Sequence, residues 1–104
     1  MDRATFQKLA EFRPKEAKVL LDSGFYAGAY YLTGYAIECA LKACIVKQIR
    51  EHTVPTRKFV DKFYTHELDT LLALADLRDQ LLALPAQRAN WLIVKDWSEQ
   101  ARYA

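Results

Sequence analysis

The sequence predicts an all-helical protein built around one long, largely buried helix. Glycine and proline are scarce, with three of each in 104 residues, which favours long helices over many short strands joined by turns. Between residues 25 and 50 the apolar side chains recur at helical spacing. The length suits a single domain, residues 1–104, with a modest core and little room for a deep active site.

Two helices are predicted ahead of the long one. Residues Ala4–Phe12 form the first, and Pro14 begins the second, because its missing N–H costs nothing in a first helical turn. The second helix continues to Leu21 and ends at Asp22-Ser23-Gly24. Gly24 there suits a left-handed C-terminal cap.

The long helix runs from about Phe25 to Arg50. At 100° per residue, one of its stripes carries two tyrosines, a glutamate–lysine pair and two isoleucines: Tyr31, Tyr35, Glu38, Lys42, Ile45 and Ile49. A nearly opposite stripe consists of alanines, which allow a neighbouring helix to approach closely: Ala29, Ala36, Ala40 and Ala43. A helix that is apolar almost all round is central, with neighbours on several sides.

The second half of the chain is predicted to hold shorter elements. Pro55 prevents the long helix from continuing, and Thr56–Tyr64 is expected to be a loop with a short helical turn. Thr65 is expected to cap a helix from His66 to about Leu84, with a break allowed at Asp76–Gln80.

Pro85 is predicted to begin the last helix, whose apolar side includes Trp91, Val94 and Trp97. The sequence contains no internal repeat, low-complexity tract or second domain.

Composition excludes several classes of protein. The net charge of +2 is too small to indicate nucleic-acid binding by itself. No apolar run approaches the roughly 20 residues that a bilayer-spanning helix needs. The start, Met1 to Thr5, lacks the apolar stretch of a signal peptide, so a cytoplasmic protein is predicted.

Neither a cofactor nor a metal is predicted. Glycine-rich phosphate loops and zinc-like ligand spacings are absent. Cys39 and Cys44 are five residues apart on one helix and point about 140° from each other. They therefore cannot pair with each other or clamp a metal, and both are expected to be reduced and buried.

Glu38 and Lys42 are the first candidates for a functional site. They stand four residues apart in the order that best forms an ion pair within a helix, yet they interrupt an apolar and aromatic stripe. A buried charge must be paired or hydrogen-bonded. The pair therefore either fixes helix register or belongs to a polar cluster, with Tyr31 and Tyr35, that faces a ligand or a second subunit.

Three further features each allow a structural and a functional interpretation. His66, near a helix N-terminus, either caps or packs, or contacts a phosphate. Arg102, next to Tyr103 at the end of the last helix, is either a surface residue or part of a site. The basic stretch Lys47–Lys62 is either a solvated loop or a contact for nucleic acid.

Several segments resemble the HEPN family (higher eukaryotes and prokaryotes nucleotide-binding domains). Residues Ala29–Ala43 resemble its central helix, and Tyr64–Leu72 resemble the Thr-His-Asp-Leu segment that opens a later helix. Residues Arg13–Tyr26 are similar to its first helix with the closing glycine, and Trp97–Tyr103 to its terminal helix. The resemblance covers most of the chain.

This resemblance implies an up-and-down helical bundle of four to five helices that often forms a homodimer. One group of HEPN proteins cleaves RNA with an arginine separated from a histidine by four to six residues, at the dimer interface. The other group is non-catalytic, often partnered with small nucleotidyltransferases, and is thought to bind nucleotides or nucleic acid.

The chain departs from the ribonuclease pattern. Eight residues separate Arg57 from His66, one separates Arg50 from His52, and no histidine follows Arg102. Because one position rotates a helical side chain by about 100°, no catalytic residue is assigned. The expected function is a non-catalytic module that binds a nucleotide or RNA, or pairs with a nucleotidyltransferase in a toxin–antitoxin-type system. Its candidate ligand-binding residues are Tyr31, Tyr35, Glu38, Lys42, His66 and Arg102.

Two alternatives remain open. The first is a ribonuclease toxin of the same fold that uses His66 and an arginine contributed across a dimer. The second is a purely structural interaction domain, in which the Glu38–Lys42 pair only sets helix register.

Overall fold

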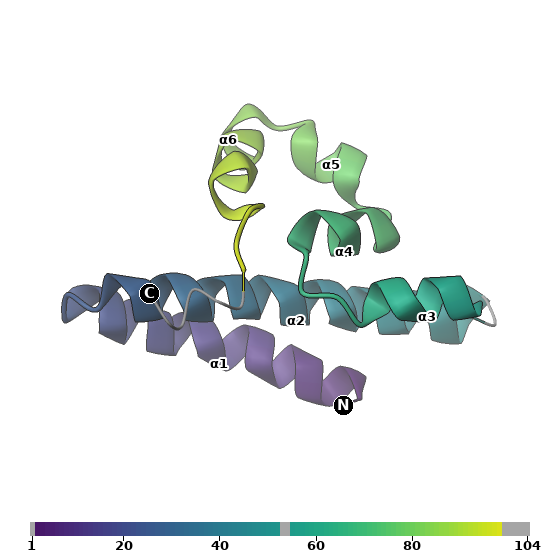
Figure 1. The fold of residues 1–104 in the computed structure, drawn as a ribbon, viewed down its shortest axis with the longest axis horizontal. Coiled ribbons are helices and arrows are strands. Elements are labelled where there is room, and N and C mark those ends of the chain that lie inside the picture. The colour runs from purple at the N-terminus through teal and green to yellow at the C-terminus, as the bar shows by residue number, and fades with distance from the viewer. Residues whose placement is uncertain (1, 53–54, 99–104) are drawn as a thin grey trace.

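The computed structural model describes the backbone of residues 2–52 and 55–98, and the side chains of 2–49 and 55–98. These ranges contain helices and no strand (Figure 1): α1 (Arg3–Asp22), α2 (Tyr26–His52), α3 (Arg57–Phe63), α4 (Leu68–Leu74), α5 (Arg78–Leu82) and α6 (Pro85–Val94). The predicted all-α fold is confirmed. The described residues form six helices where four to five were predicted: the first two predicted helices are one, α3 replaces a predicted loop, and α4 and α5 are the two halves of what was predicted as one helix with a break.

Helix α1 is continuous, so the predicted break at Pro14 is wrong. Asp2 caps its start by accepting the N–H of Thr5 at 2.9 Å, and Pro14 lies exposed in its interior. A proline inside a helix costs about 3 kcal/mol or more. Burial of Phe6 and Ala17, one on each side of the proline, holds both halves of α1 against α2 and offsets that cost.

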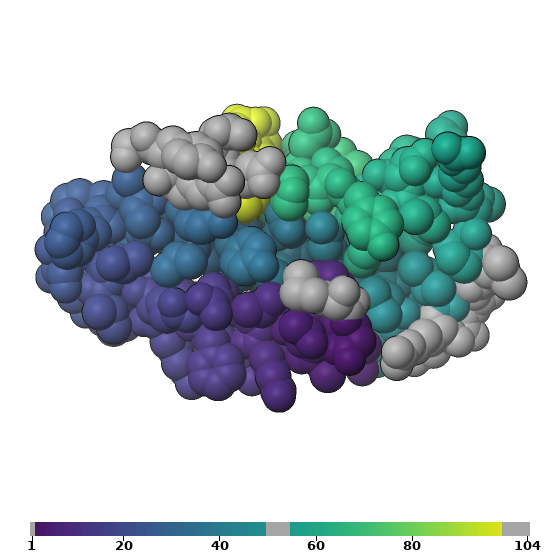
Figure 2. Space-filling model, turned by 60° about the horizontal axis from the view of Figure 1, so that its bottom comes forward, coloured from purple at the N-terminus to yellow at the C-terminus, as the bar shows by residue number. Residues whose placement is uncertain are grey.

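Helices α1 and α2 form a long antiparallel hairpin (Figure 1), and the space-filling view shows the N-terminal segment packed along the next one (Figure 2). Gly24 turns the chain between them with a φ of +83°, as its predicted role as a cap requires. The two helices approach closely at Gly28, as the space around this residue shows. A Cβ added there would lie 3.1 Å from Cδ1 of Leu20.

The alanine stripe of α2 is buried as predicted at Ala29, Ala36 and Ala43. Ala40 is an exception, since it is exposed on α2. Helices α4, α5 and α6 lie on the side of α2 away from α1 (Figure 1), so α2 has neighbours on several sides, as predicted.

Two of the predictions for Thr56–Leu84 are wrong. Residues Arg57–Phe63 form a complete short helix rather than a loop with one turn, because the Thr56 hydroxyl caps it by accepting the N–H of Phe59. Thr65 does not cap a helix from His66: its hydroxyl accepts the N–H of Glu67 at 3.1 Å, and α4 begins only at Leu68.

The break between α4 and α5 is real. Asp76 has a φ of +58°, and aspartate tolerates this left-handed conformation because its side chain can bond locally. The start of α6 at Pro85 is also confirmed, with the proline in its first turn. Helix α6 ends at Val94, so Trp97 follows the helix instead of belonging to it.

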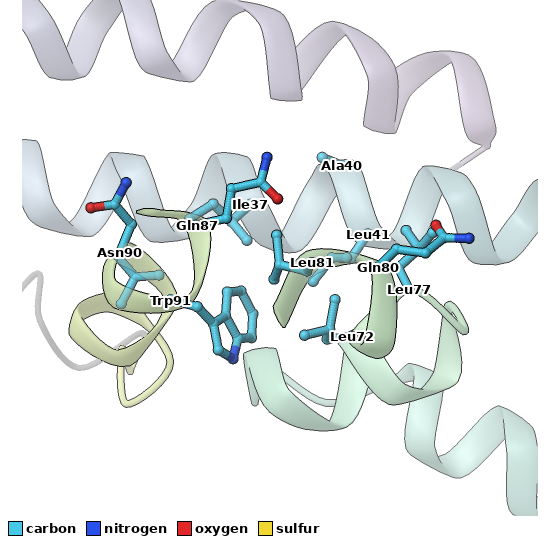
Figure 3. A pocket seen from close by; sticks show the side chains of 11 residues that line it. Ile37, Ala40, Leu41, Leu72, Leu77, Gln80, Leu81, Gln87, Asn90 and Trp91 are labelled. Carbon is cyan, nitrogen blue, oxygen red and sulfur yellow. The ribbon is translucent and has the colours of Figure 1, made fainter. Parts of the chain in front are cut away.

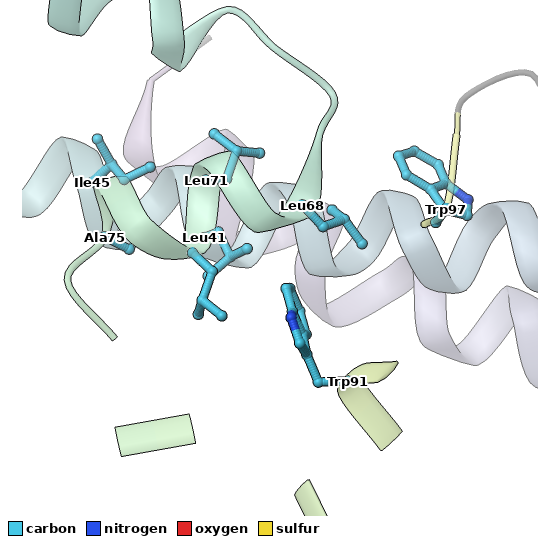
Figure 4. Close-up of a cluster of buried hydrophobic side chains, with 8 residues drawn as sticks. Leu41, Ile45, Leu68, Leu71, Ala75, Trp91 and Trp97 are labelled. Carbon is cyan, nitrogen blue, oxygen red and sulfur yellow. The ribbon is translucent and has the colours of Figure 1, made fainter. Parts of the chain in front are cut away.

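The main hydrophobic core lies between α2, α4 and the two tryptophans (Figure 4). It consists of Leu41, Ile45, Leu68, Leu71, Leu72, Ala75, Trp91 and Trp97. Two polar bonds join its walls. The Gln48 side chain donates to the carbonyl of Ala75 at 2.6 Å, and the Trp91 indole donates to the Asp69 carboxylate at 2.8 Å. None of the described helices is long and apolar enough to cross a membrane.

Candidate functional site

The site is built around a buried ion pair on α2. Glu38 and Lys42 are only 3% and 6% exposed, and the Lys42 Nζ lies 3.4 Å from the Glu38 Oε2. The ammonium of Lys42 also lies 5.3 Å from the centre of the Phe63 ring, at the end of α3. The spacing of four residues therefore forms the predicted pair, and the pair is inside the protein.

His66 completes this cluster from a different part of the chain. Its Nδ1 lies 2.7 Å from the Glu38 Oε1, so each oxygen of the carboxylate contacts one basic side chain. The His66 side chain is 47% exposed, whereas the Glu38 side chain is 4% exposed. A buried carboxylate thus fixes the orientation of an imidazole whose other part reaches the surface.

Three aromatic rings continue the same face of α2. Tyr31 stacks between Tyr35, at a centroid distance of 6.2 Å, and Trp97, at 6.0 Å. Trp97 lies directly on the backbone of α2, because a Cβ built at Gly34 would lie 2.3 Å from its indole atoms. Sequence reasoning missed Gly34 and the role of Trp97. A glycine inside a strong helical pattern was the one available signal of such a close approach.

The groups that flank the ion pair are held in their neutral forms. Burial raises the pKa of the Tyr35 phenol, and the adjacent Cys39 and Glu38 raise it further. Burial also raises the pKa of the Cys39 thiol, with the negative charge of Glu38 as the next cause. Cys39 is fully buried as predicted, but Cys44 is exposed, so the prediction of two buried cysteines is wrong for Cys44.

The two cysteines should react at very different rates with a disulfide reagent. The Cys44 thiol is exposed, whereas Cys39 is buried and the raised pKa keeps it protonated, and only the thiolate is nucleophilic. At pH 8, Ellman's reagent is expected to label one thiol per chain rapidly and the second only after urea is added. Rapid labelling that persists in a Cys44→Ala variant would contradict the burial of Cys39.

A polar hollow opens beside His66. It has a volume of about 560 Å³ and is lined by His66, Glu67, Asp69, Lys95, Asp96, Trp97 and Ser98. Lys95 lies 2.9 Å from Asp96, which raises the pKa of its ammonium. The hollow therefore offers hydrogen-bond donors and acceptors of both charges next to the fixed imidazole.

The structure brings together five of the six predicted site residues: Tyr31, Tyr35, Glu38, Lys42 and His66. Arg102 and the rest of the segment 99–104 lie outside the described residues. Within the described ranges, no group of three histidine, cysteine, aspartate or glutamate side chains is placed to hold a metal ion. Within this cluster Glu38 and Lys42 are buried, whereas about half of the His66 side chain is exposed.

Comparison with known proteins gives one result that covers nearly the whole chain. The profile of the HEPN domain matches residues 6–104. Searches of curated proteins and of solved structures found no match. The all-α arrangement around a central helix agrees with the all-helical fold of that family. The chain therefore belongs to the HEPN domain family.

Proposed function

We propose that this HEPN domain is a non-catalytic module that binds a nucleotide, free or within RNA, at the surface around His66. Membership of the family suggests a nucleotide-related or RNA-binding role. One observation carries the proposal: the half-exposed His66 imidazole is held 2.7 Å from a carboxylate that is almost completely buried. This arrangement presents a pre-oriented basic group at the surface.

A purely structural ion pair would not need the histidine. Lys42 alone neutralises the Glu38 charge within α2, as an i,i+4 pair does in many helices. His66 comes from the α3–α4 connection, 28 residues away, and keeps about half of its side chain in solvent. The cluster thus leads from the core to the surface, which is what a ligand site needs and a register-fixing pair does not.

The hollow beside His66 fits the parts of a nucleotide. Its volume of about 560 Å³ falls within the range of ligand pockets in general. The Lys95 ammonium, beside the imidazole, can bind a phosphate, as cationic donors do. The Glu67 and Asp96 carboxylates accept hydrogen bonds and suit the hydroxyl groups of a ribose.

Partner proteins form the second part of the proposal: a homodimer, and a small nucleotidyltransferase in a toxin–antitoxin-type system. Support comes from large apolar side chains that are exposed on the described surface, among them two groups. One group lies at the α1–α2 turn and the other on α6: Val19, Leu21, Phe25, Tyr26, Leu92 and Ile93. Exposed apolar groups of this kind mark interaction surfaces in many proteins.

Calorimetric titration with AMP, ATP and a short single-stranded RNA tests nucleotide binding. At least one of these ligands is expected to bind the wild-type protein. His66→Ala is expected to weaken that binding at least tenfold while leaving the helical circular dichroism unchanged. Lys58→Ala, on the exposed face of α3, is the control and should bind as the wild type does. Absence of binding to all three ligands would overturn the proposal.

RNA cleavage is the alternative that one observation favours. A carboxylate that orients a histidine is also the arrangement of a general base. The proposal expects no cleavage of RNA by the purified protein. Cleavage that disappears in His66→Ala and persists in Lys58→Ala would show that the domain is a ribonuclease and not a non-catalytic binding module.

A further inference from the structure

Two hollows meet on the side of α2 opposite the His66 cluster. One has a volume of about 540 Å³ and lies between α2, α4, α5 and α6 (Figure 3); the other, of about 560 Å³, lies between α1 and α2. Ala40 and Leu77 line both, so the hollows are neighbours. Ala40 is two positions from Glu38, which places it about 200° around the helix from the ion pair.

The first hollow is apolar and carries no charge. Its walls are eight apolar side chains and three neutral amides: Ile37, Ala40, Leu41, Leu72, Leu77, Leu81, Trp91, Val94, Gln80, Gln87 and Asn90. The Trp91 indole N–H already donates to Asp69, so the tryptophan contributes its ring to the wall (Figure 3). Such a surface favours an uncharged apolar group over water.

The second hollow is cationic. Arg3 and Lys47 line it, with Glu11 as its single acid. Among the described residues neither Arg3 nor Lys47 has an ion-pair partner, and the Arg3 Nε is buried without a hydrogen-bond partner. Because the guanidinium and the ammonium outnumber the single acid Glu11, the hollow favours an anion, above all a carboxylate or a phosphate.

We propose that the joined hollows bind a small amphipathic anion, with its apolar body against Leu41, Leu81 and Trp91 and its carboxylate or phosphate head at Arg3 and Lys47. The charges of the two hollows select this occupant: no charged side chain lines the first hollow, whereas two cations and one acid line the second. Ala40, which lines both hollows, has a small side chain. This site is separate from the nucleotide site, and its occupation by an anion does not depend on nucleotide binding.

A series of straight-chain carboxylates tests the apolar half. In calorimetric titrations, affinity is expected to rise about fourfold for each added methylene from butanoate to octanoate, because each methylene leaves water. Methylphosphonate and octylphosphonate distinguish the two head groups. Affinity that does not depend on chain length would show a simple anion contact and overturn the proposal.

Variants at the cationic half test the head group. Lys47→Gln and Arg3→Gln are each expected to weaken octanoate binding about tenfold and to leave binding of neutral 1-octanol unchanged. Glu11→Gln removes the one acid and is expected to tighten octanoate binding. If octanol binds the wild type as tightly as octanoate, the cations take no part and the proposal fails.

The junction and the independence of the site are tested together. Ala40→Phe is expected to block the passage and weaken octanoate at least tenfold, whereas Ala27→Phe, exposed on the same helix outside both hollows, should have no effect. His66→Ala should leave octanoate binding unchanged even where it abolishes nucleotide binding. Equal effects of Ala40→Phe and Ala27→Phe would contradict the proposed path.

Discussion

Replacing Glu38 with glutamine is expected to lower the free energy of unfolding by about 3–5 kcal/mol. The substitution keeps the volume of the side chain but removes the negative charge that faces Lys42 at 3.4 Å, deep in the protein. The Lys42 ammonium would then remain buried without an anion, and desolvation of an unpaired charge is costly. Urea unfolding followed by circular dichroism measures the loss.

A double substitution separates the two roles of this pair. Glu38→Leu with Lys42→Met fills the same space with apolar groups, and replacing both members of a buried pair is often neutral or stabilising. This variant is expected to recover most of the lost stability yet to lose nucleotide binding, because His66 no longer has its carboxylate. A double variant that binds as the wild type does would show that the pair only sets packing. A loss below about 1 kcal/mol in Glu38→Gln would instead indicate a solvated pair.

Replacing Gly34 with alanine is expected to destabilise the domain by about 2–4 kcal/mol. The added Cβ would lie 2.3 Å from three atoms of the Trp97 indole, far inside van der Waals contact. The ring must therefore leave α2, which exposes Trp97 and breaks its stacking on Tyr31. Urea unfolding and a red shift of tryptophan emission measure the two consequences.

Gly28→Ala is the matched control on the same helix. Its Cβ would meet only the Cδ1 of Leu20, at 3.1 Å, and this flexible end can move. The substitution is expected to cost nothing or to stabilise α2 by about 0.5–1 kcal/mol, because alanine favours a helix over glycine. Equal destabilisation by the two substitutions would contradict the close packing of Trp97 on Gly34.

Local rules predicted most of the helices and failed where packing outweighs them. The period of α2 and the glycine at residue 24 are strong local signals, and both predictions are confirmed. Pro14 is an equally strong local signal for a helix start, but α1 continues through it because α1 packs along α2 on both sides of the proline. A single sequence does not show which residues will be buried against another helix.

The candidate site was likewise predictable only in part. Glu38 and Lys42 lie on one helix, so their spacing alone predicts the ion pair, although not its burial. The contact between His66 and Glu38 spans 28 residues and depends on how the α3–α4 connection returns to α2, which spacing cannot give. The packing of the Trp97 ring on Gly34 likewise depends on the path of the chain after α6.

The imidazole of His66 can be observed directly, which tests whether a buried carboxylate presents this ring to a nucleotide. The chain has two histidines, His52 and His66, so their ring nitrogens can be followed separately by nuclear magnetic resonance. During titration with AMP or ATP, the His66 signals are expected to shift with saturation while those of His52 stay in place. Signals of His66 that do not move in the presence of a bound nucleotide would show that the nucleotide binds elsewhere and that His66 is not part of its site.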